Sequence, residues 1–150
     1  MSVERNKEIG RLWFEEMWSK PDFDLAQKII HPEYDPEWVH IPKKGPEQVI
    51  HEMKYFRSAF HNLTYKIQNI IADESKVWVH YKASAIHGGN AWGFEPSNKK
   101  VELEAMAILE IDKDGKIVNR WGAFSLFDML VELELVPPLW ELSKHFPKKE

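Results

Sequence analysis

VELEAMAILEIDKDGKIVNRWGAFSL, residues 101–126, carries the clearest pattern in the chain. Apolar side chains occupy every second position of residues 101–111, and a second alternating run follows in residues 117–125. A period of two is typical of a half-buried strand, and the Asp114-Gly115 pair between two such runs favours a β-hairpin. The sequence therefore predicts a long hairpin with one face on the core.

Side chains on the predicted buried face become smaller with distance from the turn. The large ones near the turn are Leu109, Ile111 and Ile117, and the small ones further along are Ala105, Ala107, Ala123 and Ser125. Trp121 belongs to the same alternating series. We therefore expect a hollow beside the sheet, lined by Trp121, and a hollow of this kind is the usual form of a small-molecule site.

Length and composition limit the classes of function. The 150 residues suit one domain, 1–150, with a substantial core, and the net charge of −4 offers no basic face for nucleic acid. The absence of cysteine excludes disulfides, thiol chemistry and cysteine-bound metal. The sequence contains neither a signal-peptide pattern nor an apolar run of membrane-spanning length, so we expect a cytoplasmic protein that binds neither nucleic acid nor membranes.

The order of the predicted elements indicates the fold class. The predicted helices are residues 2–19, 24–30, 47–60 and 127–135, and the predicted strands outside the hairpin are 37–41, 63–72 and 76–87. Ser2 is suited to cap the first helix, and Pro46 is suited to open the third. Helices followed by long strands predict an α+β fold, in which N-terminal helices pack on a curved, mostly antiparallel sheet. An amphipathic extension, about 136–150, is expected to cover a sheet edge, a pocket mouth or a partner chain.

Several segments resemble one family in their order and spacing. They are FEEMWSKPDFDLAQKIIHPEY, WVHIP, FRSAFHNLTYKIQNIIADESKVWVHY, HGG and DGKIVNRWGAFSLFDMLVEL, within roughly residues 10–135. This pattern resembles the SnoaL-like polyketide cyclases, also called ester cyclases, which share a fold with nuclear transport factor two and ketosteroid isomerase. The resemblance implies a cone-shaped, cystatin-like fold around a deep apolar pocket. It also implies ring closure of an aromatic polyketide ester by intramolecular aldol condensation, with an acid/base Asp and without metal or cofactor.

The sequence departs from this family at the acid/base position. The family pattern places an Asp four residues after the strand Trp, where this chain has Ser125, and often a second Asp where this chain has Ala107. The Pro-Asp that follows the third helix in the family is His61-Asn62 here. A serine hydroxyl cannot replace a carboxylate as a base, so the family's acid/base residue is not carried over intact.

Histidine is the remaining candidate for acid/base work, because its ordinary pKa lies near neutrality. His40 stands where the family has a pocket His, and His87 matches the His of a THxG-like segment. We therefore expect His40, His87 and Ser125 to be catalytic, although each histidine could instead hold a strand end. No third ligand accompanies the two histidines at metal-site spacing, so no metal is expected. The expected substrate-binding side chains are Trp13, Trp38, Met53, Tyr65, Ala107 and Trp121.

Three functions remain open from the sequence. The first is a cofactor-independent cyclase, isomerase or hydrolase-type enzyme that acts on a hydrophobic, polyketide-like metabolite. The second is a non-catalytic small-molecule binding protein of the same fold, which the replacement of the family Asp by Ser125 favours. The third is an interaction module that uses the outer sheet face to form a homodimer or a higher homo-oligomer, and it is compatible with either of the others.

Overall fold

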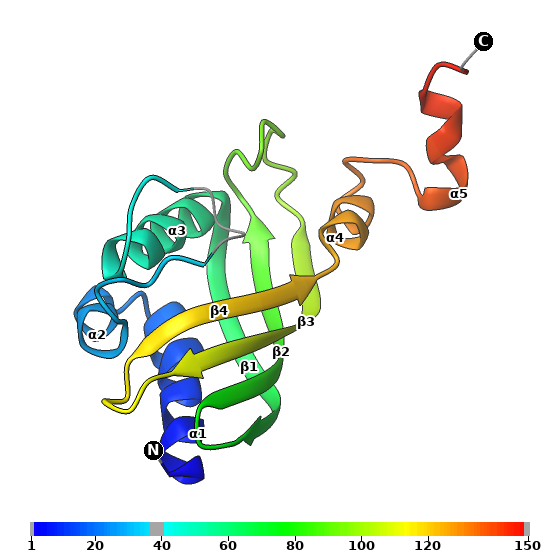
Figure 1. Cartoon of the computed structure of the whole chain (residues 1–150). Helices are drawn as coiled ribbons and strands as arrows, with labels where there is room; N and C mark the ends of the chain where they lie inside the picture. Colours follow the sequence, from blue (N-terminus) through cyan, green and yellow to red (C-terminus); the bar gives the residue numbers. More distant parts are fainter. Residues whose placement is uncertain (1, 37–40, 149–150) are drawn as a thin grey trace.

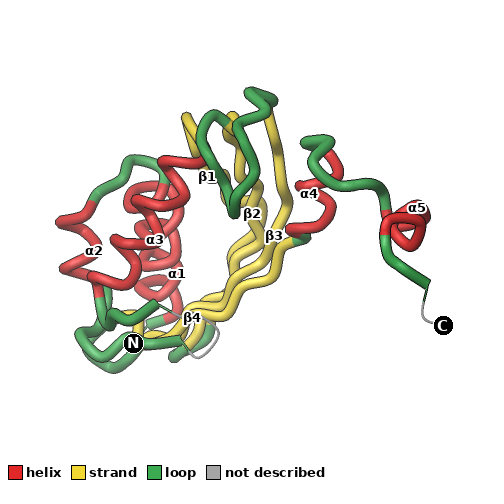
Figure 2. The backbone as a smooth tube through the Cα atoms, turned by 90° about the horizontal axis from the view of Figure 1, so that it is seen from above, coloured by secondary structure: helices red, strands yellow, loops and turns green. Residues whose placement is uncertain are grey.

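The protein is a curved antiparallel sheet with its N-terminal helices packed on one face (Figure 1). The computed structural model describes residues 2–36 and 41–148. The strands follow the order β1-β2-β3-β4, so each strand pairs with its neighbour in sequence. Seen from above, α1, α2 and α3 all lie on the same side of the curved sheet (Figure 2). The predicted α+β architecture is confirmed.

The bounds of the elements agree closely with the predicted ranges. The helices are α1 (Val3–Arg11), the π-helical η1 (Leu12–Trp18), α2 (Phe23–Ile29), α3 (Pro46–Ala59), α4 (Leu126–Glu132), α5 (Leu139–Leu142) and the short 3-10 helix η2 (Ser143–His145). The strands are β1 (Phe60–Ala72), β2 (Lys76–His87), β3 (Lys100–Ile111) and β4 (Ile117–Phe124). The predicted strand 37–41 falls largely on residues 37–40, which lie outside the described residues. None of the helices in the described part of the chain is long and apolar enough to cross a membrane.

The first predicted helix is present, but it changes type halfway. The Ser2 hydroxyl accepts a hydrogen bond from the backbone N–H of Arg5 at 3.2 Å and caps α1 as expected. The chain then continues through the π-helical segment η1, which buries Trp13, Phe14, Met17 and Trp18. A π-helical segment has more residues per turn and so presents a different set of side chains than an α-helix does. Within this segment Trp18 contacts strand β1, since its ring centroid lies 5.8 Å from that of Tyr65.

Side chains of the two central strands alternate between the inner and outer face, as the period of two predicts for residues 101–111. In β2, Val77 and Val79 are fully buried, and in β3, Ala107 and Leu109 are buried on the same face. Their pairing runs without interruption from Lys76 opposite Glu110 to Ile86 opposite Lys100. The buried face of β3 is therefore the face that the period of two predicted.

The second strand of the hairpin does not keep the predicted faces. Ile111 pairs with Ile117 and Glu110 pairs with Asn119, so Val118 is an extra residue on β4, a β-bulge. Because one extra residue reverses the parity of a strand, every side chain after the bulge changes face. Arg120 consequently points to the interior, whereas Trp121 is 50% exposed on the outer face. The prediction that Trp121 and Ala123 share the buried face is wrong for this reason.

The opposite edge strand, β1, contains register shifts of the same kind. One shift falls between His61 and Thr64, where Asn62 adopts a left-handed conformation with φ of 55°. Another falls between Ile67 and Asn69, after which Ile71 is 63% exposed. Side chains of β1 therefore alternate regularly between the inner and outer face only from Leu63 to Ile67.

The C-terminal segment extends away from the rest of the chain. Helix α4 contacts β3, but α5 stands apart from the sheet and from the N-terminal helices (Figures 1 and 2). Its side chains Leu139 and Trp140 are 70% and 79% exposed, and Phe146 beyond it is also exposed. The described part of the extension, residues 136–148, therefore does not cover the sheet edge of its own chain.

Candidate functional site

A cavity of about 120 Å³ lies between α3, the inner face of the sheet and α4. Its walls are largely apolar, as is usual for small-molecule sites. The lining side chains come from η1, α3, all four strands, α4 and the loop between β2 and β3. Among the lining residues are Tyr65 and Ala107, two of the side chains expected to contact a substrate.

The cavity has a polar end formed by Glu52 of α3 and Arg120 of β4. The Arg120 guanidinium Nη2 donates a hydrogen bond to Glu52 Oε2 at 3.0 Å, and the two side chains are only 14% and 9% exposed. The second carboxylate oxygen, Oε1, has no hydrogen-bond partner among the described residues. Buried carboxylates are normally fully hydrogen-bonded, so Oε1 is an acceptor available to a ligand.

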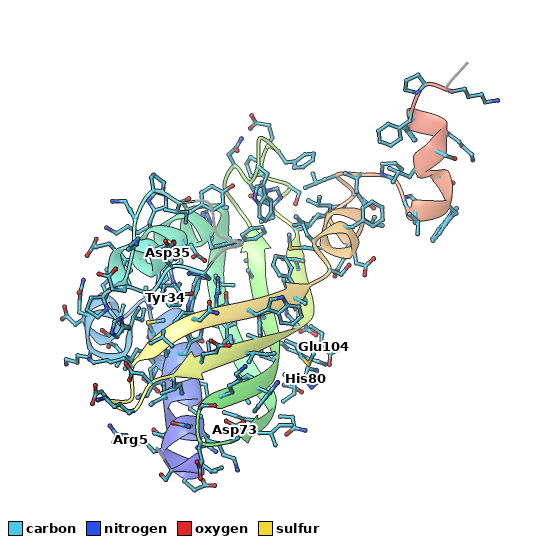
Figure 3. All side chains as sticks on the ribbon, in the orientation of Figure 1. Arg5, Tyr34, Asp35, Asp73, His80 and Glu104 are labelled. Atoms are coloured by element: carbon cyan, nitrogen blue, oxygen red, sulfur yellow. The ribbon has the colours of Figure 1, made fainter. Side chains whose placement is uncertain are left out.

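Aromatic side chains also surround Arg120. The guanidinium lies 5.6 Å from the ring centroid of Trp13, within the range of a cation–π contact. Burial raises the pKa of Tyr34, labelled in Figure 3, to about 12, although the Arg120 charge lowers it in part. Burial opposes the charge on Arg120, but Tyr34 and Glu52 offset this effect, and the pKa of Arg120 is raised. Arg120 therefore carries a permanent positive charge at this end of the cavity.

Two further tyrosines occupy the wall between the polar end and the aromatic part. Burial raises the pKa of Tyr65 above its ordinary range, and the neighbouring Tyr81 raises it further. Burial also raises the pKa of Tyr81, which Arg120 opposes. Their ring centroids are 5.5 Å apart. Both phenols therefore remain protonated at neutral pH and are potential hydrogen-bond donors rather than bases.

Large and small side chains occupy different parts of the wall. The large ones are Trp18, Phe56, Phe60, Trp92 and Phe124, and the small ones on the sheet floor are Ala83, Ala85, Ala107 and Gly122. Ala107 pairs with Gly122 across β3 and β4. Since small residues on the floor leave room above them, the predicted hollow beside the sheet is present, although Trp121 is not part of its wall.

His87 does not line this cavity. It is fully buried at the end of β2, where the backbone N–H of Ser97 donates to its Nδ1 at 3.2 Å and the Ser97 hydroxyl lies 3.0 Å from the same atom. Because Nδ1 accepts a hydrogen bond, the neutral ring carries its proton on Nε2, which has no partner among the described residues. His87 thus holds the base of the loop between β2 and β3, which corresponds to the structural alternative given for it.

Ser125 has a structural role that its position in the sequence did not reveal. It is exposed, and its hydroxyl accepts a hydrogen bond from the backbone N–H of Asp128 at 3.2 Å. This is the N-cap of α4. The expectation that Ser125 faces the cavity is wrong, because the bulge in β4 places Phe124 rather than its neighbour on the inner face.

Two of the predicted substrate-binding residues belong to the core instead. Trp13 and Met53 are almost completely buried, and neither lines the cavity. Trp13 supports the site through its contacts with Arg120 and with the ring of the lining residue Trp18, whose centroid is 6.4 Å from its own. Trp38 and His40 lie outside the described residues, so the prediction of a catalytic His40 remains a prediction.

Sequence reasoning missed the polar end of the site. Glu52 lies three residues after Val49 and four before Phe56, so it shares the apolar face of α3. A charged residue on an apolar helix face can be recognised from the sequence, and it would have indicated a buried polar site at Glu52. No such signal existed for Arg120, because regular alternation assigns it to the outer face of β4. Among the described residues, no group of three or more His, Cys, Asp or Glu side chains could hold a metal ion.

The chain matches a model of one protein family and several solved structures. The family is described as SnoaL-like polyketide cyclase, and the match spans residues 9–133. A search of curated proteins finds no match.

The structural relatives extend over nearly the whole chain. TsrD from Streptomyces laurentii superposes with a TM-score of 0.82 at 15% identity, covering 91% of this chain and 99% of its own. AclR from Streptomyces galilaeus gives 0.76 at 23% identity, covering 91% and 100%. A SnoaL-like polyketide cyclase from Agrobacterium tumefaciens str. C58 gives 0.72 at 10% identity, covering 89% and 99%. At these identities the similarity establishes the fold alone.

Proposed function

The chain belongs to the SnoaL-like polyketide cyclase family, and on this premise we propose that it is a cofactor-independent enzyme of the cyclase or isomerase type. Its substrate is a hydrophobic, polyketide-like metabolite bound in the cavity, with a carbonyl oxygen directed to the polar end. The observation that carries this proposal is the buried pair of Glu52 and Arg120, whose carboxylate keeps one oxygen available in an otherwise apolar cavity.

The proposed reaction is a proton transfer followed by ring closure. Glu52 Oε1 removes a proton from the carbon next to the carbonyl, and the negative charge that develops on the carbonyl oxygen is stabilised by Arg120. The resulting enolate carbon attacks a second carbonyl of the same molecule and forms the new carbon–carbon bond. The protonated Glu52 then returns its proton to the alkoxide, so the carboxylate is regenerated and no external reactant is needed.

The apolar walls contribute by holding the substrate in a reactive conformation. When both reacting groups belong to one molecule, a preorganised cavity supplies several kcal/mol of the barrier reduction through orientation. Phe56, Tyr65 and Tyr81 contribute aromatic rings to the lining, and Gly122 adds no side chain that would reduce the space. This division between a polar end and aromatic walls supports a reaction on a carbonyl compound with an extended apolar part.

A panel of polyketide β-keto esters and related epoxides, followed by mass spectrometry, tests the proposal. We expect wild-type turnover, a reduction of about 10²- to 10⁴-fold in Glu52→Gln, and no reduction in Glu47→Gln, a matched control on the exposed side of the same helix. His40→Ala serves as the competing variant. A loss of turnover in His40→Ala with full activity in Glu52→Gln would replace Glu52 by His40 as the acid/base residue.

The second candidate is a non-catalytic protein that binds a hydrophobic small molecule. It is favoured by the exchange of the family's two Asp positions for Ser125 and Ala107, and by the Arg120 charge that neutralises Glu52. In that case the same panel gives saturable binding without turnover, and Glu52→Gln changes affinity only. Turnover by the wild-type protein would eliminate this candidate.

We also propose that the outer sheet face forms a homodimer. The residues Ile71, Trp78, Ile108 and Trp121 face one another across all four strands and form a continuous apolar row. Polar side chains border this row, as the hydrogen bond between His80 and Glu104 illustrates (Figure 3). Met106, which is 49% exposed and pairs with His80 and Ala123, adds to the apolar surface. An exposed apolar row with a polar surround is typical of a protein interface.

Light scattering after size-exclusion chromatography tests the homodimer. We expect Trp121→Glu to yield monomers, and Trp140→Glu, which changes an exposed aromatic residue on α5, to leave the mass unchanged. Dissociation by Trp140→Glu but not by Trp121→Glu would place the interface at the C-terminal extension instead.

A further inference from the structure

The loop between β2 and β3 brings Trp92 to the wall of the cavity. Its tip is a two-residue turn, in which the N–H groups of Ala91 and Phe94 donate to each other's carbonyl oxygens at 3.1 and 2.8 Å. Trp92 and Gly93 between them have φ of 50° and 88°. These values define a type I′ turn, whose favoured sequence is Asn-Gly. Bulky residues rarely adopt positive φ, so the left-handed backbone conformation of Trp92 is unfavourable for a tryptophan.

Local contacts hold the Trp92 backbone in this conformation. The backbone N–H of Trp92 donates to the hydroxyl of Tyr55 on α3 at 3.0 Å, and the backbone N–H of Gly93 donates to Asn90 Oδ1 at 3.1 Å. The base of the loop is fixed by the contact of His87 with Ser97. Strained residues held in this way concentrate at ligand-binding sites. The loop therefore presents one side chain in a defined place.

The Trp92 ring completes a row of aromatic rings along the cavity. Its centroid lies 6.0 Å from those of both Phe56 and Phe60, and Phe56 in turn lies 6.2 Å from Trp18. At the same time the Trp92 side chain remains 42% exposed while lining the cavity. Trp92 thus keeps accessible surface that a ligand can cover.

We infer that Trp92 is the specificity-determining residue of the cavity and that it selects planar aromatic ligands over saturated ligands of the same size. The inference rests on the proposed binding function of this cavity and does not depend on turnover. Stacking on an aromatic face rewards a flat π-system beyond the area that it buries. Arg120 and Trp92 line the same cavity, so a ligand can direct an oxygen to the former and an aromatic ring to the latter.

Two probes of matched size test this selectivity: 2-naphthol and its saturated counterpart, decahydro-2-naphthol. Dissociation constants are measured by calorimetry for wild type, Trp92→Asn, Trp92→Phe and Phe94→Leu. Trp92→Asn gives the turn its favoured sequence, so the loop keeps its shape while the ring is lost. Phe94→Leu is the matched control, because Phe94 belongs to the same turn but does not line the cavity.

We expect the wild type to prefer 2-naphthol, and Trp92→Asn to reduce this preference by about 2- to 10-fold. Trp92→Phe should restore most of it, and Phe94→Leu should leave it unchanged. The inference is overturned if Trp92→Asn keeps the wild-type preference, or if the wild type binds neither probe. If the protein prefers 2-naphthol through Trp92 but turns over no substrate, the proposed enzyme is contradicted and this inference stands. If turnover depends on Glu52 but Trp92→Asn leaves the ligand preference unchanged, this inference is contradicted and the proposed enzyme stands.

Discussion

The two central strands and the two edge strands of the sheet differ in how regularly their side chains alternate. The pairing of β2 with β3 is continuous, whereas β1 and β4 each contain register shifts. An extra residue in a central strand would disturb hydrogen bonds to two neighbours, but in an edge strand it disturbs only one. The edge strands therefore accommodate bulges, and their faces do not follow from the sequence pattern.

This difference explains why the charged residue of the sheet that lines the cavity, Arg120, comes from an edge strand. The central strands supply a floor of small apolar residues, such as Ala83 and Ala107, which alternation assigns correctly. The edge strand β4 supplies Arg120, because the bulge at Val118 turns it inward. A single unpaired residue thus converts a polar outer position into the charged group of a cavity, a use of bulges that is common near binding sites.

Deleting one residue from each strand of the hairpin tests this comparison most severely. Deletion of Ile108 from β3 should exchange the faces of the residues on one side of it and bury Glu102 and Glu104 in place of apolar side chains. We expect a loss of more than about 5 kcal/mol, which is enough to unfold an average domain. Deletion of Val118 leaves all other pairs of β4 in register and should cost only about 1–3 kcal/mol. Circular dichroism with urea titration measures both, and equal effects would contradict the comparison.

Replacement of Arg120 tests whether the bulge really turns it inward. Arg120→Met leaves the Glu52 carboxylate buried without its partner, so we expect the free energy of unfolding to fall by about 3–5 kcal/mol. The double variant Arg120→Met with Glu52→Gln should recover most of that loss, because no uncompensated charge remains. A change of less than about 0.5 kcal/mol in the single variant would mean that Arg120 lies on the outer surface.

Truncation of one large residue on each strand gives a smaller contrast. Leu109 is fully buried in the core beneath the sheet, so Leu109→Ala should lower the free energy of unfolding by about 2–5 kcal/mol. Trp121→Ala should change it by about 0.5 kcal/mol or less when the protein is dilute enough to be monomeric. Urea unfolding at low concentration measures both changes. A loss of several kcal/mol in Trp121→Ala would restore Trp121 to the inner face.

The smallest expected effect is a pH dependence on the inner side of the sheet. The pKa of Tyr34 is raised to about 12 in the folded protein from an ordinary value of 10. Below pH 10 the phenol is protonated in both states, but between pH 10 and 12 the unfolded chain loses its proton first. Stability should therefore fall with rising pH by up to about 1.4 kcal/mol per pH unit from this group alone.

Tyr34→Phe should make that fall shallower, by about 1 kcal/mol at pH 11. Chemical denaturation at pH 8, 10 and 11 provides the measurement, and the values at pH 8 serve as the internal control. An unchanged slope in the variant would show that Tyr34 is not buried beside Arg120.

Much of the fold was predictable from local patterns. Ser2, Pro46 and the Asp114-Gly115 turn acted as signals that depend on a few neighbouring residues, and each is found where it was expected. The helix that continues through η1 was predicted in extent but not in type. The π-helical segment buries four large side chains, and this tertiary packing cannot be predicted from neighbouring residues in the sequence.

The site was predictable only in part. The space beside the sheet followed from the small residues of β3, and Tyr65 and Ala107, which were expected to contact a substrate, are among the residues that line it. Ser125 and His87 were chosen by position in a pattern, and the structure gives both of them hydrogen bonds that stabilise a helix start and a loop. Glu52 was within reach of sequence reasoning, because it interrupts an apolar helix face.

The sequence by itself determined the fold class, the family, the order of the elements and the faces of the central strands, because periodicity and turn chemistry act over short distances along the chain. Only the tertiary structure decided which residue of β4 faces the cavity, since the bulge at Val118 depends on the pairing with β3. It also decided that Glu52 and Arg120, 68 positions apart in the chain, meet at 3.0 Å. A buried charge requires a partner of opposite charge nearby. That partner can be distant in the sequence, so a local sequence pattern does not identify it.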